Sequence, residues 1–250
     1  MEIIAREATV ATAAGASGPR RMLWAKGTSL GRFARMKTVL CFGDSNTWGY
    51  DPEATAAFPY PVRHAPAVRW TGVLAAELGA EWRVIEEGQN GRTTVHEDPF
   101  NAARCGRAVL PALLESHMPL EAVVMMLGTN DLKHVYASPA GEIAMGATVL
   151  ARMILQSAAG PDARPPKLLL VAPPAVGNLV HVPELDEKFS AAEAKSQRFP
   201  ELYRRAAEQL GCGFLSAQDF TTPSPVDGLH LDAESHRMLG VAIAAAVREL

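Results

Sequence analysis

Four short polar stretches of the chain contain residue types that could together carry out acyl transfer. They are Gly43–Asn46, Gly88–Thr93, Gly128–Asp131 and Asp227–His230. A serine hydroxyl is a poor nucleophile until a neighbouring base takes its proton, and histidine is the base best matched to neutral pH. The first stretch contains Ser45 and the last contains His230. The sequence therefore predicts Ser45 as a nucleophile and His230 as its general base.

The other groups that acyl transfer needs are present in the same stretches. Asp227 precedes His230 by three residues across an Asp-Gly turn, a spacing that lets its carboxylate orient the imidazole. Attack on a carbonyl produces an oxyanion, which needs hydrogen-bond donors fixed in advance. The backbone N–H groups of Ser45 and Gly91 and the side-chain amide of Asn130 are donors of a suitable type. We expect these three groups to form an oxyanion hole.

The elements that must position these stretches are strands and helices in alternation. Five apolar runs have the length of buried strands: Val39–Phe42, Trp82–Ile85, Ala122–Leu127, Lys167–Val171 and Gly213–Leu215. Five stretches have helical character: Val68–Leu78, Arg104–His117, Pro139–Ala158, Ala191–Leu210 and Ala233–Leu250. Apolar strands that alternate with amphipathic helices indicate parallel β-α-β units. The sequence thus predicts an α/β protein with one doubly wound, three-layer domain.

A parallel sheet would bring the polar stretches together. In an open parallel sheet, ligands bind beyond the carboxyl ends of the strands. The first three polar stretches leave predicted strands one, two and three, and Asp219–Pro225 leads from the fifth strand to Asp227–His230. We expect all four stretches to lie at one edge of the sheet and to face a common crevice.

Three local features refine the predicted elements. Pro111 inside a helical stretch predicts a kink or a late helix start. Asp232 is placed to cap the last helix. The long polar segment Pro173–Ser190 is predicted to be a loop or lid rather than a domain boundary.

Composition and charge limit the classes of function. The 250 residues are 48% apolar and 20% charged, which is typical of a globular protein with a sizeable core. The net charge of −3 gives no electrostatic reason to expect nucleic acid or an anionic membrane as a partner. No run approaches the roughly 20 apolar residues that span a bilayer. No metal or cofactor is expected, because the sequence has no HExxH motif, no carboxylate cluster and no P-loop or dinucleotide glycine spacing.

The cysteines and the N-terminal segment bear on location and domain limits. Cys41, Cys105 and Cys212 are widely spaced and odd in number, which argues against a disulfide framework and favours a reducing, cytoplasmic location. The first 35 residues carry six basic and two acidic side chains and lack a sustained period. We expect residues 1–35 to be a disordered extension and residues 36–250 to be the functional domain.

The four polar blocks resemble those of the SGNH hydrolases, also called GDSL esterases. FGDSNTWG (Phe42–Gly49), the Asn90-Gly91 turn, GTND (Gly128–Asp131) and DGLH (Asp227–His230) occur in that family's order. The resemblance implies a flavodoxin-like α/β/α sandwich with a five-stranded parallel sheet. It also implies a Ser45-His230-Asp227 triad and an oxyanion hole of Ser45, Gly91 and Asn130. One departure is visible, because Asn46 replaces the leucine that usually follows the serine.

Within that family the chain is similar to the bacterial arylesterase and acyltransferase branch. The similarity rests on CFGDSNTWGY, VRWTGVLAAELG, VIEEGQNGRTT and MLGTNDLK. It implies a small-molecule ester substrate with a short-chain or aryl group, possible acyl transfer to alcohols or peroxide, and a homo-oligomer. It further implies that Trp48 and Tyr50 line the acyl pocket and that Leu229 sits beside the triad.

Other interpretations of the same residues stay open at this point. The triad could serve a carbohydrate deacetylase or an acyl thioesterase, or the fold could be a non-catalytic module that binds an acyl or sugar ligand. Trp48 could be a core anchor. Asp44 and Asp131 are expected to hold their turns rather than react. Arg92 and Lys133 could contact a substrate carboxylate, but they are expected to be solvated loop charges.

Overall fold

A parallel sheet of five strands forms the centre of the protein. The computed structural model describes residues 35–250, so the predicted extension at residues 1–35 lies almost wholly outside the described residues. The strands are β1 (Lys37–Gly43), β2 (Trp82–Gly88), β3 (Ala122–Met126), β4 (Lys167–Ala172) and β5 (Gly213–Ser216). They are hydrogen-bonded in the order β2-β1-β3-β4-β5, and every pairing is parallel. The α/β fold and the five strands are thus confirmed.

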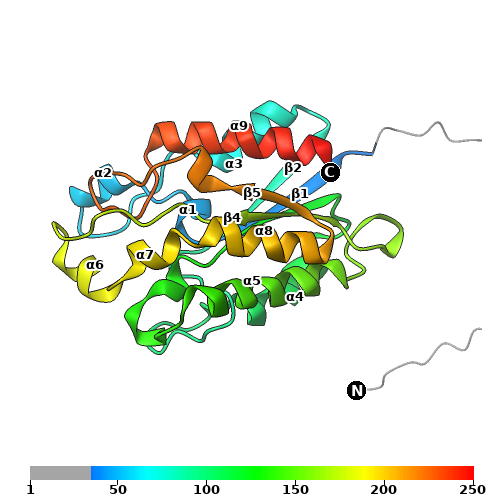
Figure 1. Cartoon of the computed structure of the whole chain (residues 1–250). Helices are drawn as coiled ribbons and strands as arrows, with labels where there is room; N and C mark the ends of the chain where they lie inside the picture. Colours follow the sequence, from blue (N-terminus) through cyan, green and yellow to red (C-terminus); the bar gives the residue numbers. More distant parts are fainter. Residues whose placement is uncertain (1–34) are drawn as a thin grey trace, which may run out of the picture. The chain divides into compact units, whose positions relative to one another are not determined.

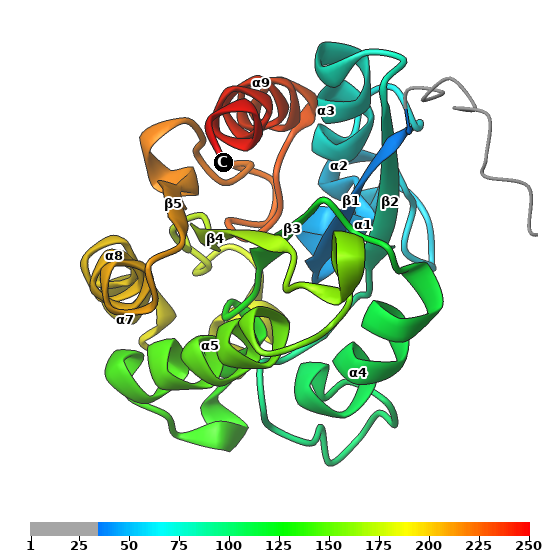
Figure 2. The same ribbon diagram turned by 90° about the vertical axis from the view of Figure 1, so that its right-hand side faces the viewer.

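Helices cover both faces of the sheet and make three layers. Figures 1 and 2 show α3 and α9 on one face and α4, α5 and α8 on the other. Their bounds are Trp70–Leu78 for α3, Gly106–His117 for α4, Ala140–Leu155 for α5, Phe199–Leu210 for α8 and Ala233–Glu249 for α9. Each of them overlaps a stretch that the sequence predicts to be helical.

Two hydrophobic cores lie on the two faces of the sheet. In β1, Val39 and Cys41 pack in the core under α3 and α9, whereas Leu40 and Phe42 pack in the core under α4, α5 and α8. Successive side chains of a strand point to opposite faces, so a strand covered on both sides is apolar at every position. This is why β1 appears in the sequence as a continuous apolar run rather than as an alternation.

Short helices occupy the connections between these elements. They are α1 (Ser45–Trp48), α2 (Pro52–Ala56), α6 (Pro183–Lys188) and α7 (Ala192–Ser196), with single 3₁₀ turns at Asn130–Leu132, His134–Tyr136, Pro161–Ala163 and Ala217–Asp219. In Figure 1, α1, α2, α6 and α7 all lie toward the left-hand end of the molecule, beyond the carboxyl ends of the strands. The four short helices thus lie at the carboxyl edge of the sheet.

The structure corrects two predictions about this region. The segment Pro173–Ser190 is not only a loop, because α6 forms inside it with Pro183 in its first turn, where a missing N–H costs nothing. The stretch Ala191–Leu210 is two helices rather than one. Pro200 cannot donate to the carbonyl of Ser196 and its ring would clash there, so α7 ends at Ser196 and α8 starts anew at Phe199.

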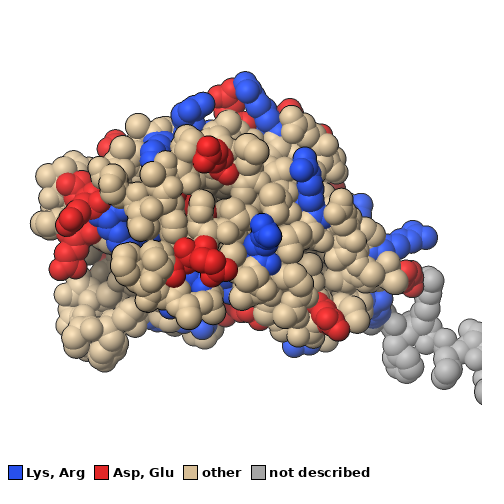
Figure 3. All heavy atoms as spheres, turned by 90° about the horizontal axis from the view of Figure 1, so that it is seen from below, with Lys and Arg blue, Asp and Glu red and all other residues tan. Residues whose placement is uncertain are grey.

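Helix ends elsewhere agree better with the sequence. The Asp232 carboxylate accepts a hydrogen bond from the Ser235 N–H at 2.7 Å and caps α9 as predicted. Helix α4 begins at Gly106 and contains Pro111, so the proline does not delay the helix start. None of the helices in residues 35–250 is long and apolar enough to cross a membrane. Figure 3 shows acidic and basic side chains interspersed over the face seen from below.

Candidate active site

The turn after β1 holds Ser45 at the carboxyl edge of the sheet. Asp44 accepts a hydrogen bond from the Asn46 N–H at 3.0 Å and caps the one-turn helix α1. The chain leaves α1 through Gly49, whose φ of +89° is in the left-handed region. Gly43 is required before this turn, because a Cβ there would collide with the Thr47 side chain. Ser45 is therefore held on a tight, closely packed turn.

The loop between β5 and α9 holds the predicted base. The Asp227 Oδ1 accepts hydrogen bonds from the backbone N–H groups of Leu229 and His230, both at 2.9 Å. Gly228 has a φ of +66° and lets the loop turn back on itself. The Ser224 N–H donates to the His230 carbonyl at 2.7 Å and closes the loop. The loop thus has an internal framework that presents the imidazole.

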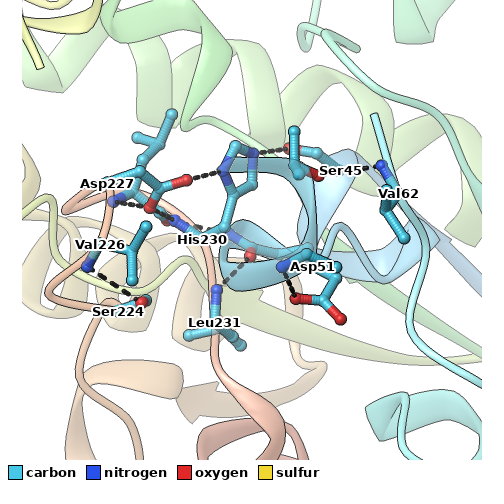
Figure 4. Close-up of polar contacts among 12 residues, drawn as sticks. Ser45, Asp51, Val62, Ser224, Val226, Asp227, His230 and Leu231 are labelled. Atoms are coloured by element: carbon cyan, nitrogen blue, oxygen red, sulfur yellow. Dashed lines mark hydrogen bonds and ion pairs between the residues drawn. The ribbon is translucent and has the colours of Figure 1, made fainter. Parts of the chain in front are cut away.

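Ser45, His230 and Asp227 form one hydrogen-bonded line (Figure 4). The distance from Ser45 Oγ to His230 Nε2 is 3.0 Å, and His230 Nδ1 lies 2.6 Å from Asp227 Oδ2. All three residues are at most 9% exposed. An ionised carboxylate can only accept, so Nδ1 carries the hydrogen and Nε2 is free to accept from the serine hydroxyl. The arrangement can remove a proton from Ser45.

The Asp227 carboxylate is ionised because of its partner. Burial acts to raise its pKa, but the hydrogen bond from His230 and the charge of the imidazolium outweigh that effect, so the pKa is lowered. A carboxylate of this kind stabilises the imidazolium that forms when the histidine takes a proton.

The three predicted oxyanion donors lie in the segments that follow β1, β2 and β3. Within residues 35–250, neither the Ser45 N–H nor the Gly91 N–H has an acceptor. The Asn130 amide donates one hydrogen to the Arg92 carbonyl at 3.1 Å, which fixes its direction and leaves its second hydrogen available. Gly91 has a φ of +80°, a conformation that favours glycine. The predicted oxyanion donors are thus of the right type and are free to bind a ligand oxygen.

Arg92 is buried, which corrects the expectation of a solvated loop charge. It is 4% exposed, donates to the carbonyls of Gly43 and Glu87 at the ends of β1 and β2, and lies over the Phe42 ring with its Cζ 4.5 Å from the ring centroid. Burial lowers its pKa to about 10. Arg92 thus ties two strand ends together beneath the Ser45 turn.

Lys133 is also buried, and here too the solvated interpretation is wrong. It is 5% exposed, and its Nζ lies 3.2 Å from an Asp98 carboxylate oxygen. Burial lowers the pKa of Lys133. The ion pair joins the loop after β2 to the turn after β3, and it explains why a lysine is tolerated in a buried position.

Asp44 caps its own turn, as the sequence predicts, whereas Asp131 bonds to the loop after β2. Asp131 accepts hydrogen bonds from both the backbone N–H and the hydroxyl of Thr94. Burial raises its pKa to about 7 and raises that of Asp44 to about 6. Neither carboxylate hydrogen-bonds to His230. Among residues 35–250, no group of three or more His, Cys, Asp or Glu side chains could hold a metal ion.

The three predicted pocket residues differ in their contacts. The Tyr50 ring stacks on the His230 imidazole, with centroids 3.8 Å apart and planes inclined by 19°. Trp48 is half-buried, and the Arg63 guanidinium lies 5.2 Å from its ring centroid. Leu229 is buried in the core under α5 and α8. Their role as an acyl pocket remains a prediction.

The sequence interpretation missed one contact of the site. The Asn46 side chain does not serve its own turn but reaches the loop that carries His230, where it hydrogen-bonds to the backbone of Leu229 and Leu231. The one available signal was the departure from leucine at this position. No periodicity or spacing could have indicated a partner about 185 residues away along the chain.

Comparison with known proteins identifies close structural relatives. The model of the GDSL-like lipase/acylhydrolase family matches residues 41–238. The native aryl esterase of M. smegmatis is 40% identical, with a TM-score of 0.81 over 86% of this chain and 99% of that one. Est24, a carbohydrate acetylesterase from Sinorhizobium meliloti, is 39% identical, with a TM-score of 0.81 over 85% and 99%. The search of curated proteins finds no match.

Proposed function

Because the chain belongs to the GDSL-like lipase/acylhydrolase family and is an ester-hydrolysing serine hydrolase, we propose that Ser45 is its nucleophile. His230 is the general base, and Asp227 orients and stabilises it. The observation that carries this proposal is the continuous line from Ser45 Oγ through the imidazole to the Asp227 carboxylate, with distances of 3.0 and 2.6 Å. The line connects turns that follow β1 and β5.

The first half of the reaction forms an acyl-enzyme. His230 Nε2 takes the Ser45 proton as Oγ attacks the ester carbonyl, and the imidazolium is stabilised by Asp227. The carbonyl oxygen becomes an oxyanion and accepts hydrogen bonds from the N–H groups of Ser45 and Gly91 and from the free amide hydrogen of Asn130. The tetrahedral intermediate then collapses. Its alkoxide leaves with the proton from His230, and the acyl group stays on Ser45.

The second half repeats the same steps with a new nucleophile. Water donates a proton to the neutral His230 and attacks the acyl carbonyl. The second oxyanion is held by the same donors, and collapse returns the proton to Ser45 and releases the acid. An alcohol or peroxide in place of water would give acyl transfer by the same route.

Short-chain and aryl carboxylic esters are the proposed substrates. The support is the 40% identity to an aryl esterase over nearly the whole of that protein. The test is release of p-nitrophenol from p-nitrophenyl acetate by the wild type and by Ser45→Ala as the matched control. If the wild type releases p-nitrophenol no faster than Ser45→Ala, the proposed hydrolysis through Ser45 is wrong, and the binding-module alternative is favoured.

A second candidate substrate class is the acetylated carbohydrate. It is favoured by the similar degree of identity to a carbohydrate acetylesterase. A panel of aryl acetate, acetylated sugar and acyl-CoA, each compared by kcat/KM, separates arylesterase from carbohydrate deacetylase and acyl thioesterase. Whichever substrate gives the highest value, Ser45→Ala must abolish the activity for the proposed mechanism to hold.

Trp48, Tyr50 and Leu229 are proposed to bound the acyl side of the substrate. The stacking of Tyr50 on His230 supports this role, because it places the face of an aromatic ring against the imidazole of the triad. Substitution of Trp48 by alanine should shift the preferred acyl length in a series of p-nitrophenyl esters. An unchanged preference would remove Trp48 from the pocket.

The proposal also covers the domain bounds, the cellular location and the oligomeric state. Residues 36–250 are the catalytic domain, and a chain that starts at Met36 should keep full activity. A cytoplasmic location is supported by Cys41, Cys105 and Cys212, which are all free thiols. A homo-oligomer is supported by the resemblance to the arylesterase branch, and light scattering on the purified full chain would test it.

A further inference from the structure

Asn46 links the nucleophile turn to the loop that carries the base. Its Oδ1 accepts a hydrogen bond from the Leu231 N–H at 3.1 Å, and its Nδ2 lies 3.5 Å from the Leu229 carbonyl oxygen. Figure 4 shows Leu231 directly below the imidazole. The side chain is 1% exposed, and the cap of α1 is made by the Asp44 carboxylate instead. Both hydrogen bonds of the Asn46 amide thus go to the other loop.

The two bonds lie on either side of His230. A residue in a parallel strand accepts from the N–H after its partner residue and donates to the carbonyl before it. The Asn46 amide does the same with Leu231 and Leu229. It therefore acts as a strand neighbour for His230, although no strand is present there, and it fixes the peptide groups on both sides of the histidine.

This link supplies something that the triad itself does not. Asp227 sits on the same loop as His230, so its bonds set the orientation of the imidazole within the loop but not the distance of the loop from Ser45. Asn46 is the residue next to Ser45 in the chain. Its bonds therefore fix the loop against the nucleophile turn directly, whereas the Ser45–His230 bond must form and break during the reaction.

We propose that Asn46 is a positioning residue that sets the distance between Ser45 Oγ and His230 Nε2. The inference rests on the proposed function, since it gives Asn46 a role in that same triad. A general base must lie within about 2.6–3.2 Å of the proton donor, and a displacement of 1 Å can cost about 100-fold in rate. A leucine at this position has a similar volume and cannot make either bond.

Asn46→Leu tests the proposal. We expect kcat on p-nitrophenyl acetate to fall by roughly 10- to 100-fold while KM stays within about twofold, because the base is displaced and the ester still binds. Thr47→Ser is the matched control. Thr47 is buried on the same turn and its Oγ1 has no hydrogen-bond partner among residues 35–250, so loss of its methyl group disturbs packing alone and should change kcat by less than about twofold.

A double-mutant cycle separates positioning from general damage. In a His230→Ala background, addition of Asn46→Leu should cause no further loss of the residual rate, because the group that Asn46 positions is gone. An equal loss in both backgrounds would overturn the proposal, as would a single variant with kcat within twofold of wild type. If Asn46→Leu fails to fold, Asn46→Ala adds no atoms to the buried site and takes its place in the same cycle.

The failure of the proposed function would look different. If Ser45→Ala kept wild-type activity, the nucleophile assignment would be wrong whatever the Asn46 variants did. If Ser45→Ala were inactive and Asn46→Leu kept the kcat of the wild type, the proposed triad would be supported and only the proposed role of Asn46 would be wrong.

Discussion

Two buried carboxylates at the carboxyl edge of the sheet differ in what surrounds them. Asp227, on the loop after β5, is paired with His230, and its pKa is lowered. Asp131, on the turn after β3, accepts hydrogen bonds from the neutral N–H and hydroxyl of Thr94, and burial raises its pKa to about 7. Burial disfavours the charged form in both cases. The difference is therefore made by the partner.

The comparison shows how one sheet edge can use the same side chain in two ways. A carboxylate that faces an ionisable base can stabilise charge during a reaction. Asp131 is hydrogen-bonded by neutral donors, and the nearest ionisable base, His96 Nε2, lies 4.0 Å away with a pKa lowered by burial. A carboxyl in this setting holds loops together, and its desolvation costs stability. Asp44 resembles Asp131 in this respect. It lies next to the nucleophile, yet burial raises its pKa to about 6.

The largest expected effect is the loss of the Asp227 charge. Asp227→Asn should lower kcat on p-nitrophenyl acetate by about 10⁴-fold, because an amide that donates to Nδ1 holds the imidazole in the wrong tautomer. Asp131→Asn, the matched substitution at the other carboxylate, should lower kcat by less than about tenfold. Steady-state kinetics on both variants measures the contrast. Equal losses would show that the two carboxylates are not functionally distinct.

The next effect concerns the residue beside Asp131. Asn130→Ala should reduce kcat by roughly 10²–10³, the usual result when one oxyanion donor is removed. The turn after β3 would then contribute to catalysis through the Asn130 amide and not through the carboxyl group next to it. A loss below threefold would remove Asn130 from the oxyanion hole and leave Ser45 and Gly91 as its donors.

The pH dependence of the rate sharpens the same contrast. His230 must be neutral to accept the Ser45 proton, so kcat/KM should fall on acidification, by up to about tenfold per pH unit once the imidazolium dominates. Asp131→Asn should leave the shape of this profile unchanged, because Asp131 makes no contact with the triad. A rate that does not fall at any acidic pH at which the protein stays folded would contradict a histidine base.

Much of the carboxyl edge of the sheet could be predicted from the sequence, because it depends on residues that are close together in the chain. The strands are buried on both faces, so each is a continuous apolar run, and parallel strands must end at the same edge. Asp227 and His230 lie three residues apart on one loop, which makes their contact a local matter. Asp232 caps its helix over the same short range.

The features that sequence analysis missed depend on partners distant in the chain. Arg92 is buried because two strand ends present carbonyl groups to it, and Lys133 because Asp98 meets it from another loop. Asn46 bonds to a segment about 185 residues away. Such contacts are set by how the loops meet at the sheet edge, which no period or motif records.

The smallest expected effect is on stability and concerns Asp131 itself. Its pKa is raised from an ordinary value near 3.8 to about 7 in the folded protein. The folded state therefore binds more protons than the unfolded state between these values, and the free energy of unfolding falls as pH rises through this window. Between pH 4.5 and 6.5, the loss relative to Asp131→Asn should be on the order of 2 kcal/mol.

Urea unfolding of the wild type and of Asp131→Asn at several pH values gives this difference directly. The substitution also changes the bonds to Thr94, but that change is a constant offset, so only the slope of the difference against pH reports the carboxyl group. Carboxylates that do not interact with Asp131 cancel in the difference because both proteins contain them. Asp44 does not cancel, because burial and the charge of Asp44 both raise the pKa of Asp131 and the two groups titrate as a pair. A wild type that does not lose stability relative to Asp131→Asn as pH rises would mean that Asp131 is ionised at little cost, and the distinction from Asp227 would then rest on catalysis alone.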